Sequence, residues 1–224
     1  MRVSARVVSI MDSVFENNMH AFGGAISIMK NKKSIDMTIS ESTFDSNQAL
    51  FGGAVYVEPN IHELRLVVHD SSFDYNLAAE STNIANDGGS GGAFYFAYVE
   101  GDDHDCCFER NKFFGNVANA IFNEFGISGA GGAIYYQPNE NNGNCTLKNN
   151  EFKENYANFG GAILFKRGLN LKSENNTFAD NHAWINGGAT SIQKVNYSEK
   201  NNRYWGKHTF VFKILFIISI INIS

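Results

Sequence analysis

The stretch FKENYANFGGAI, residues 152–163, decides the fold, because the chain repeats its pattern F-x-x-N-x-A-x-x-G-G-A-I. Six copies of F-x-x-N are each followed by G-G-A, and their phenylalanines are Phe15, Phe44, Phe73, Phe113, Phe152 and Phe178. The asparagines, three residues on, are Asn18, Asn47, Asn76, Asn116, Asn155 and Asn181. The first glycines are Gly23, Gly52, Gly91, Gly131, Gly160 and Gly187. A motif pair that recurs with a period of roughly 20–50 residues indicates a repeat architecture such as a solenoid.

The residues around the motif alternate between apolar and polar positions. The phenylalanines are 29, 29, 40, 39 and 26 residues apart, which leaves room for about three short strands and three turns in each unit. Upstream of Phe44, Met37 and Ile39 flank Thr38, and a period of two with one apolar face is typical of a half-buried strand. Each such strand has its counterpart one repeat away, so we expect parallel sheets. The sequence therefore predicts an all-β fold, a parallel β-helix (solenoid) of about six to seven coils.

Stacked coils place like residues above one another, about 4.8 Å apart. We expect the phenylalanine column to fill the core and the asparagine column to point inward, where its amides bond one another and the turn backbone. The paired glycines should supply a bend with positive φ or a close approach between backbones. A degenerate seventh copy follows at Asn201-Asn202-Arg-Tyr204. The predicted organisation is a β-helix over 1–205 and a short hydrophobic tail over 206–224.

The third and fourth copies each carry ten extra residues between the asparagine and the glycine pair, near 79–90 and 119–130. Equal insertions in neighbouring coils should project side by side, and loops of this length commonly serve a function. We predict a binding surface from Phe122 and Phe125 of the second insertion together with a row of outward tyrosines. That row is Tyr56, Tyr95 and Tyr135. Stacked aromatic rings suit contact with a glycan or a protein, and the alternative is that the tyrosines reflect strand propensity alone.

The pairing of F-x-x-N with G-G-A-I resembles the repeat of the chlamydial polymorphic outer membrane proteins, and similar repeats occur in large surface proteins of protists. The resemblance covers roughly residues 8–192. It implies a right-handed, pectin-lyase-like parallel β-helix that is displayed at the cell surface and has adhesive roles. Copy one departs from the pattern at His20, and copy six departs from it at Thr190.

The composition suits strands joined by tight turns, with 43% hydrophobic residues, 21 glycines and two prolines among 224 residues. The net charge of −5 argues against a nucleic-acid partner, which would require a basic stripe. No signal peptide precedes the first copy, so we expect a fragment, or a true N-terminus that lies upstream. The apolar run Phe210–Ser224 is shorter than the roughly 20 residues of a membrane-spanning helix. It is interpreted as a partial membrane segment, as a tail of the GPI-anchor type, or as sequence outside the repeat at a truncated end, and we favour attachment to a membrane.

Three cysteines are too few for a disulfide scaffold, yet two of them share a column. Cys106 and Cys145 each lie seven residues before a motif phenylalanine, which brings their Cα atoms within disulfide range in a stacked fold. They are either bonded or stacked as reduced thiols, and the sequence favours reduced thiols because inward columns of small apolar residues are common. Cys107 is expected to point outward and to stay free.

Few residues are candidates for catalysis or metal binding. The acidic cluster DDHD, residues 102–105, is interpreted as a solvated turn, with metal binding or catalysis as the alternative. Polysaccharide-degrading β-helices use carboxylates that converge from adjacent coils, whereas consecutive side chains diverge. Asp12, Glu41 and Asp70 share a column that continues as Arg110 and offers no base. We therefore expect no column to present a catalytic set.

The sequence predicts a non-enzymatic protein without cofactor or metal, secreted or displayed at the cell surface. It would act as a structural spacer or as an adhesin for a glycan or a protein. The alternatives are a carbohydrate-active β-helix enzyme of the pectate-lyase or polygalacturonase kind, and a fragment without independent function. Patterns of the form N-x-[ST], which favour secretion, begin at Asn144, Asn175 and Asn196.

Overall fold

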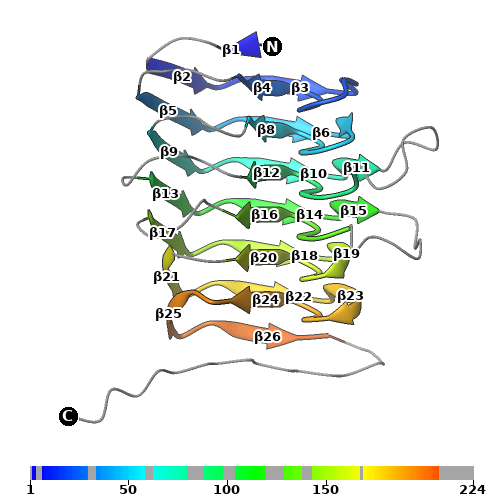
Figure 1. The fold of residues 1–224 in the computed structure, drawn as a ribbon, viewed down its shortest axis with the longest axis vertical. Coiled ribbons are helices and arrows are strands. Elements are labelled where there is room, and N and C mark those ends of the chain that lie inside the picture. The colour runs from blue at the N-terminus through cyan, green and yellow to red at the C-terminus, as the bar shows by residue number, and fades with distance from the viewer. Residues whose placement is uncertain are drawn as a thin grey trace.

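The computed structural model describes residues 2–3, 7–29, 34–58, 63–79, 88–97, 104–119, 129–137, 143–166 and 169–206. The predicted tail after residue 206 and most of both insertions, with Phe122 and Phe125, lie outside the described residues, as do Asp102 and Asp103. Within the described ranges the chain consists of strands and turns and contains no helix. The strands stack along the long axis of the molecule (Figure 1).

The strands form four parallel sheets, which the chain visits in turn within each complete coil. The long-strand sheet contains β2 (Val7–Met11), β5 (Ile35–Ser40), β9 (Leu64–His69), β13 (His104–Glu109), β17 (Gly143–Lys148), β21 (Leu169–Glu174) and β25 (Asn196–Lys200). The Phe sheet contains β3 (Val14–Glu16), β6 (Thr43–Asp45), β10 (Ser72–Asp74), β14 (Lys112–Phe114), β18 (Glu151–Lys153), β22 (Thr177–Ala179) and β26 (Arg203–Trp205). The short sheet contains β7 (Gln48–Ala49), β11 (Leu77–Ala79), β15 (Val117–Asn119), β19 (Tyr156–Phe159) and β23 (His182–Asn186). The Gly-Gly sheet contains β1 (Arg2–Val3), β4 (Ile26–Ile28), β8 (Val55–Val57), β12 (Phe94–Ala97), β16 (Ile134–Gln137), β20 (Ile163–Lys166) and β24 (Thr190–Gln193).

The register of these sheets confirms the predicted parallel β-helix. Phe73 lies opposite Phe44 in one neighbouring coil and opposite Phe113 in the other. The Phe sheet has seven strands, and the last of them pairs Tyr204 of the degenerate copy with Phe178. A complete coil has four strands rather than the expected three, because the residues between the asparagine and the glycine pair form a strand of their own.

The phenylalanine column forms the centre of the core. Its rings lie nearly parallel, with centroids 4.7 to 5.0 Å apart from Phe15 to Phe178, and Tyr204 continues the stack. Phe94 of the Gly-Gly sheet packs edge-on against Phe73 at 4.7 Å. Each fully buried phenylalanine stabilises the fold by about 1.5–3 kcal/mol. Because the rings stack from coil to coil, the column joins all seven coils in one apolar core.

The asparagine column forms the predicted inward ladder. The Oδ1 atom of Asn76 accepts hydrogen bonds from the backbone N–H and the Nδ2 group of Asn47, at 3.1 and 2.9 Å. Its own Nδ2 group donates to the carbonyl of Phe44 and to Oδ1 of Asn116, both at 3.0 Å. The same contacts recur from Asn18 to Asn181. Because every polar atom of a buried amide then has a partner, the column carries little desolvation penalty.

A second amide column lies two residues before each core aromatic residue, and sequence reasoning missed it. Asn111 donates to Oδ1 of Asn150 at 3.1 Å and to the carbonyl of Val68 at 2.8 Å. In the earlier coils serines take this place, and the backbone N–H of Ser71 donates to Oδ1 of Asn111 at 3.1 Å. The signal was an asparagine at this position in the last four copies, hidden by the serines in the first three.

Both expected roles of the glycine pair are present, one at each glycine. The first glycine of every pair has a φ between 61° and 69°, which favours a residue without a Cβ atom. The second faces the backbone of the next coil: a Cβ atom on Gly92 would lie 1.9 Å from the carbonyl oxygen of Gly132. The pair therefore makes the bend and also permits the coils to stack.

Candidate functional site

The predicted outward tyrosines point away from the main core, but they do not form an open surface. Tyr56 and Tyr135 are only 7% and 8% exposed, and Tyr95 is half-buried. A second row of side chains covers them: the ring of Phe51 lies 4.8 Å from that of Tyr95, and Phe159 packs in the small cluster around Tyr135. The prediction of an exposed tyrosine surface is therefore wrong for Tyr56 and Tyr135.

The covered tyrosines form a ladder of their own. Their ring centroids are 5.6 Å apart between Tyr56 and Tyr95 and 5.0 Å apart between Tyr95 and Tyr135. Burial, assisted by the charge of Glu58, raises the pKa of Tyr56 to about 12. The ammonium of Lys166 lies 5.6 Å from the ring centroid of Tyr135. These contacts are those of a packed layer that stabilises the coil.

Cys106 and Cys145 are joined in a disulfide between β13 and β17. Their Cα atoms are 4.5 Å apart, since the parallel register places the two residues directly opposite each other. Of the two alternatives left open by the sequence, the bond is present, and the preference for reduced thiols is wrong. Cys107 is free and half-buried, as an outward residue of the same strand, and burial raises the pKa of its thiol.

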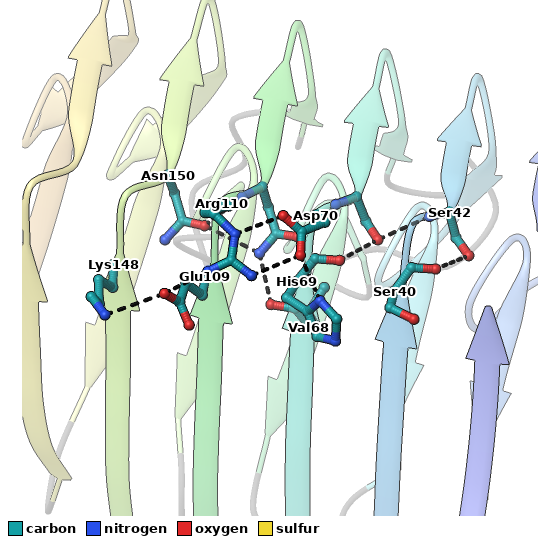
Figure 2. Close-up of polar contacts among 11 residues, drawn as sticks. Ser40, Ser42, Val68, His69, Asp70, Glu109, Arg110, Lys148 and Asn150 are labelled. Atoms are coloured by element: carbon teal, nitrogen blue, oxygen red, sulfur yellow. Dashed lines mark hydrogen bonds and ion pairs between the residues drawn. The ribbon is translucent and has the colours of Figure 1, made fainter. Parts of the chain in front are cut away.

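Charged side chains gather at the ends of the long strands and on the turns that follow them, which lead to the Phe sheet (Figure 2). Arg110 donates to both carboxylate oxygens of Asp70, from Nε at 2.7 Å and from Nη2 at 2.8 Å. The hydrogen bond from Arg110, with a second from His69, holds the pKa of the Asp70 carboxyl well below its usual range. Glu109 lies 2.7 Å from Arg110 and 3.2 Å from Lys148. The column of Asp70 and Arg110, together with the adjacent column of Glu109 and Lys148, therefore forms an ion-pair network across three coils.

The predicted acidic cluster is described only in part. The side chain of Asp105 is exposed and accepts a hydrogen bond from Nδ2 of Asn144 at 3.1 Å. Asn144 in turn accepts from Asn170, and Asn170 accepts from Asn196. Asp105 thus begins a row of surface amides along the long-strand sheet.

A shallow groove of about 310 Å³ lies on the outer face of the Phe sheet. Its lining residues are Asp45, Asp74, Tyr75, Lys112, Phe113, Phe114, Glu151 and Lys153. Apart from the buried Phe113 and the turn residue Tyr75, they occupy the positions directly before and after the core phenylalanines, where side chains point outward. Sequence reasoning missed this site, although alternation about the motif phenylalanine does place these positions on one face.

The wall of the groove is aromatic. The Tyr75 ring lies over Gly115 of the next coil, 2.7 Å from where a Cβ atom would be. Tyr75 also meets Phe114 edge-on, with centroids 5.0 Å apart, and stays 56% exposed. On the other side, the ammonium of Lys153 lies 5.5 Å from the centroid of Phe114. Gly115 thus leaves space that the Tyr75 ring fills.

One end of the groove carries two neighbouring carboxylates. Asp45 and Asp74 are direct neighbours in the parallel register. Asp45 accepts a hydrogen bond from the hydroxyl of Ser46 at 2.8 Å. Burial raises the pKa of Asp74; the charge of Asp45 adds to the shift, while Ser72 and Lys112 oppose it. Converging carboxylates beside aromatic rings can accept hydrogen bonds from a polar ligand.

The chain has no significant match among protein-family models, curated proteins or solved structures. In the part of the chain that the structure describes, no three or more His, Cys, Asp or Glu side chains gather as a metal site would require. No helix with the length and apolar character needed to cross a membrane occurs in those same residues.

Proposed function

We propose that this chain is a non-enzymatic β-helix protein, secreted or displayed at the cell surface, which serves as a rigid spacer or as an adhesin. The observation that carries the proposal is the continuity of its columns. The Phe column and the Asn column run through successive coils without interruption. Seven coils at about 4.8 Å give a rod roughly 34 Å long, with a side-chain surface on every face.

Two further features support a place outside the cytoplasm. The bond between Cys106 and Cys145 suits an oxidising compartment, because disulfides are rare where thiols are kept reduced. The repeat also resembles that of the polymorphic outer membrane proteins, a pectin-lyase-like family whose members are displayed on cells. Attachment through Phe210–Ser224 belongs to the same proposal, as does a glycan or protein ligand. The net charge of −5 favours such a ligand over nucleic acid.

The proposal is tested on intact cells and on coated beads. Antibodies against the full chain should label unpermeabilised cells of the source organism, or the chain should be recovered from their medium. Beads coated with the chain should adhere to cells or to an extracellular matrix more strongly than beads coated with albumin. Labelling that requires permeabilisation, without recovery from the medium, contradicts the proposal.

A second candidate function is a carbohydrate-active enzyme, and the pair Asp45 and Asp74 favours it. Glycoside hydrolysis uses two carboxyl groups, one of which acts as an acid and needs a raised pKa. Burial raises the pKa of Asp74. Release of reducing ends or of unsaturated products from neutral or uronate polysaccharides, with and without Ca²⁺, would support this function if Asp74→Asn abolished it. No release by the wild-type chain leaves the non-enzymatic proposal in place.

A further inference from the structure

The groove on the outer face of the Phe sheet combines features that the stacked core does not require. Tyr75 is a large aromatic residue left 56% exposed. Glu16, Asp45 and Asp74 form a row of like charges, of which the last two line the groove, although opposite residues of like charge destabilise a sheet. The Tyr75 ring does pack over Gly115 and against Phe114, but more than half of its surface faces solvent. The like-charged pair gives the sheet no stabilisation, and both features would serve a ligand in the groove.

We infer that this groove binds a neutral, hydroxyl-rich oligosaccharide that lies along the axis of the rod. The inference rests on the proposed function as an adhesin and deepens it, because it locates the glycan site on the Phe sheet and not on the tyrosine ladder. The tyrosine ladder is covered, whereas the groove is open.

The aromatic wall supplies the apolar contact. One face of a pyranose ring presents C–H groups, and an aromatic face packs well against such a surface. The Tyr75 ring packs edge-on against the Phe114 ring, with centroids 5.0 Å apart, and lies over the backbone of Gly115. These contacts fix its orientation. A ring that is already fixed loses little conformational entropy when a sugar stacks on it.

The polar groups of the groove supply hydrogen bonds. Ionised carboxylates are acceptors only, and sugar hydroxyls are donors that match them. In the described part of the chain, neither Asp45 nor Asp74 is in an ion pair, whereas Lys153 lies 3.3 Å from Glu154. Asp45 accepts one hydrogen bond from Ser46 and Asp74 accepts one from Ser72, and a carboxylate with two oxygens has further lone pairs for a ligand.

The balance of charge decides between neutral and acidic glycans. Three carboxylates and two lysines line the groove, which leaves it slightly acidic. A uronate or sulfated glycan would place its charges against Asp45, Asp74 and Glu151, and like charges at close range oppose binding. A neutral glycan meets both signs through its hydroxyl groups and carries no such penalty.

The groove is long enough for a short oligosaccharide. Its lining runs from Asp45 in the second coil to Lys153 in the fifth, three coil spacings or about 14 Å. The aspartates lie at one end, Tyr75 and Phe114 at the centre, and Lys153 at the other end. A chain of sugar rings along the axis would meet these groups in that order.

The test is calorimetric titration of the full chain with neutral oligosaccharides built from glucose, mannose, xylose or N-acetylglucosamine. Oligogalacturonate, a sulfated oligosaccharide and a lysine-rich peptide serve as competing ligand classes. At least one neutral oligosaccharide should bind. Tyr75→Ala and Asp74→Asn should each weaken that binding roughly tenfold, the effect of about 1.4 kcal/mol, and Tyr75→Phe should retain it.

Matched controls separate the groove from the rest of the surface. Trp205→Ala removes another exposed aromatic residue from the same sheet face, and Asp36→Asn removes an exposed carboxylate from the long-strand sheet. Both should leave the affinity within about twofold. Saturation-transfer NMR on the wild-type chain, with transfer from aromatic protons to the sugar C–H groups, gives an answer that depends on no variant.

Several results would overturn the inference: no binding of any neutral oligosaccharide, tighter binding of oligogalacturonate, sulfated glycan or peptide, or binding that Tyr75→Ala leaves unchanged. The bead assay keeps this outcome distinct from the proposed function. If beads coated with the wild-type chain and beads coated with Tyr75→Ala adhere equally, the chain is still an adhesin, but the groove is not its binding site. If the chain binds a neutral oligosaccharide in the groove but its beads fail to adhere, the groove is a glycan site and the proposed function as an adhesin is wrong.

Discussion

Tyr135 and Tyr75 both point away from the main core, in neighbouring coils, yet only one of them reaches solvent. Tyr135 is 8% exposed and Tyr75 is 56% exposed. Outside the Gly-Gly sheet, the segment before each glycine pair adds a second row, with Ala130 and Phe159 packed against the tyrosine cluster. The Phe sheet instead presents an open groove. Alternation along a strand thus identifies the side chains that point away from the core. Whether such a side chain is exposed to solvent depends on whether another segment of the chain packs over it.

The largest loss of stability is expected from a substitution at the glycine pair, which follows the segment that covers the tyrosines. Gly92→Ala would put a Cβ atom 1.9 Å from the carbonyl oxygen of Gly132. The coils would have to separate locally, and we expect the free energy of unfolding to fall by about 4 kcal/mol, with urea denaturation as the measurement.

Gly188→Ala is the matched control, because the nearest atom to its Cβ would be the carbonyl oxygen of Asn181 at 3.6 Å. It is the same glycine of the pair, in the last copy, and should cost less than about 1 kcal/mol. Equal losses for the two variants would show that stacking of the coils does not set the requirement for glycine.

Removal of the two compared tyrosines should give the next largest difference. Tyr135→Ala leaves a cavity beneath the covering row and should lower the free energy of unfolding by about 3 kcal/mol. Tyr75→Ala should change it by no more than about 0.5 kcal/mol, since the ring is mostly exposed. Thermal and urea unfolding followed by circular dichroism measure both, and similar losses would mean that the groove wall is as structural as the covered layer.

Alkaline titration should reveal the covered layer directly. The pKa of Tyr56 is raised to about 12 from 10.0, so the unfolded chain loses this proton first as the pH rises. The free energy of unfolding should therefore fall between pH 10 and 12, by about 2 kcal/mol from this group. Tyr56→Phe should make that part of the pH profile less steep, and a profile identical to that of the wild-type chain would contradict the burial of Tyr56.

The smallest effect is expected at the open ion pair of Asp70 and Arg110. A carboxyl whose pKa is lowered by folding stabilises the fold above its unfolded pKa of 3.8 and loses this contribution as the pH falls below that value. Arg110→Ala should lower the free energy of unfolding only slightly at pH 7, because the pair is exposed to solvent, and by still less at pH 2. The loss at pH 7 should also shrink in high salt, and a loss that is independent of both pH and salt would point to packing.

Much of the interior could be predicted from the sequence. The columns of Phe44 and Asn47 follow from the repeat, because each residue finds its own counterpart in the next coil. The second amide column at Asn111 was missed because serine stands in its place in the first three copies. The fourth strand of each coil was missed because β7 and β11 contain only two and three residues.

The candidate site was predicted less well. The tyrosine ladder was placed correctly on the outward side of its strands, but its cover comes from another column, which includes Phe51. The groove depends on a side chain that is absent at Gly115 and on a ring that leans across from Tyr75. Such a contact joins unlike positions in different coils, and no repeated motif encodes it.

The sequence by itself determined that this chain winds into stacked coils, and that the phenylalanine and asparagine columns of the repeat face the interior. It could do so because each residue of these columns packs against the equivalent residue of the next coil, so the repeat alone specifies the contacts. Only the tertiary structure decided which outward rows are covered, that Cys106 and Cys145 are bonded, and where the groove opens. Those outcomes depend on distances between different columns across the turns, and the turn geometry emerges only when the coils pack together.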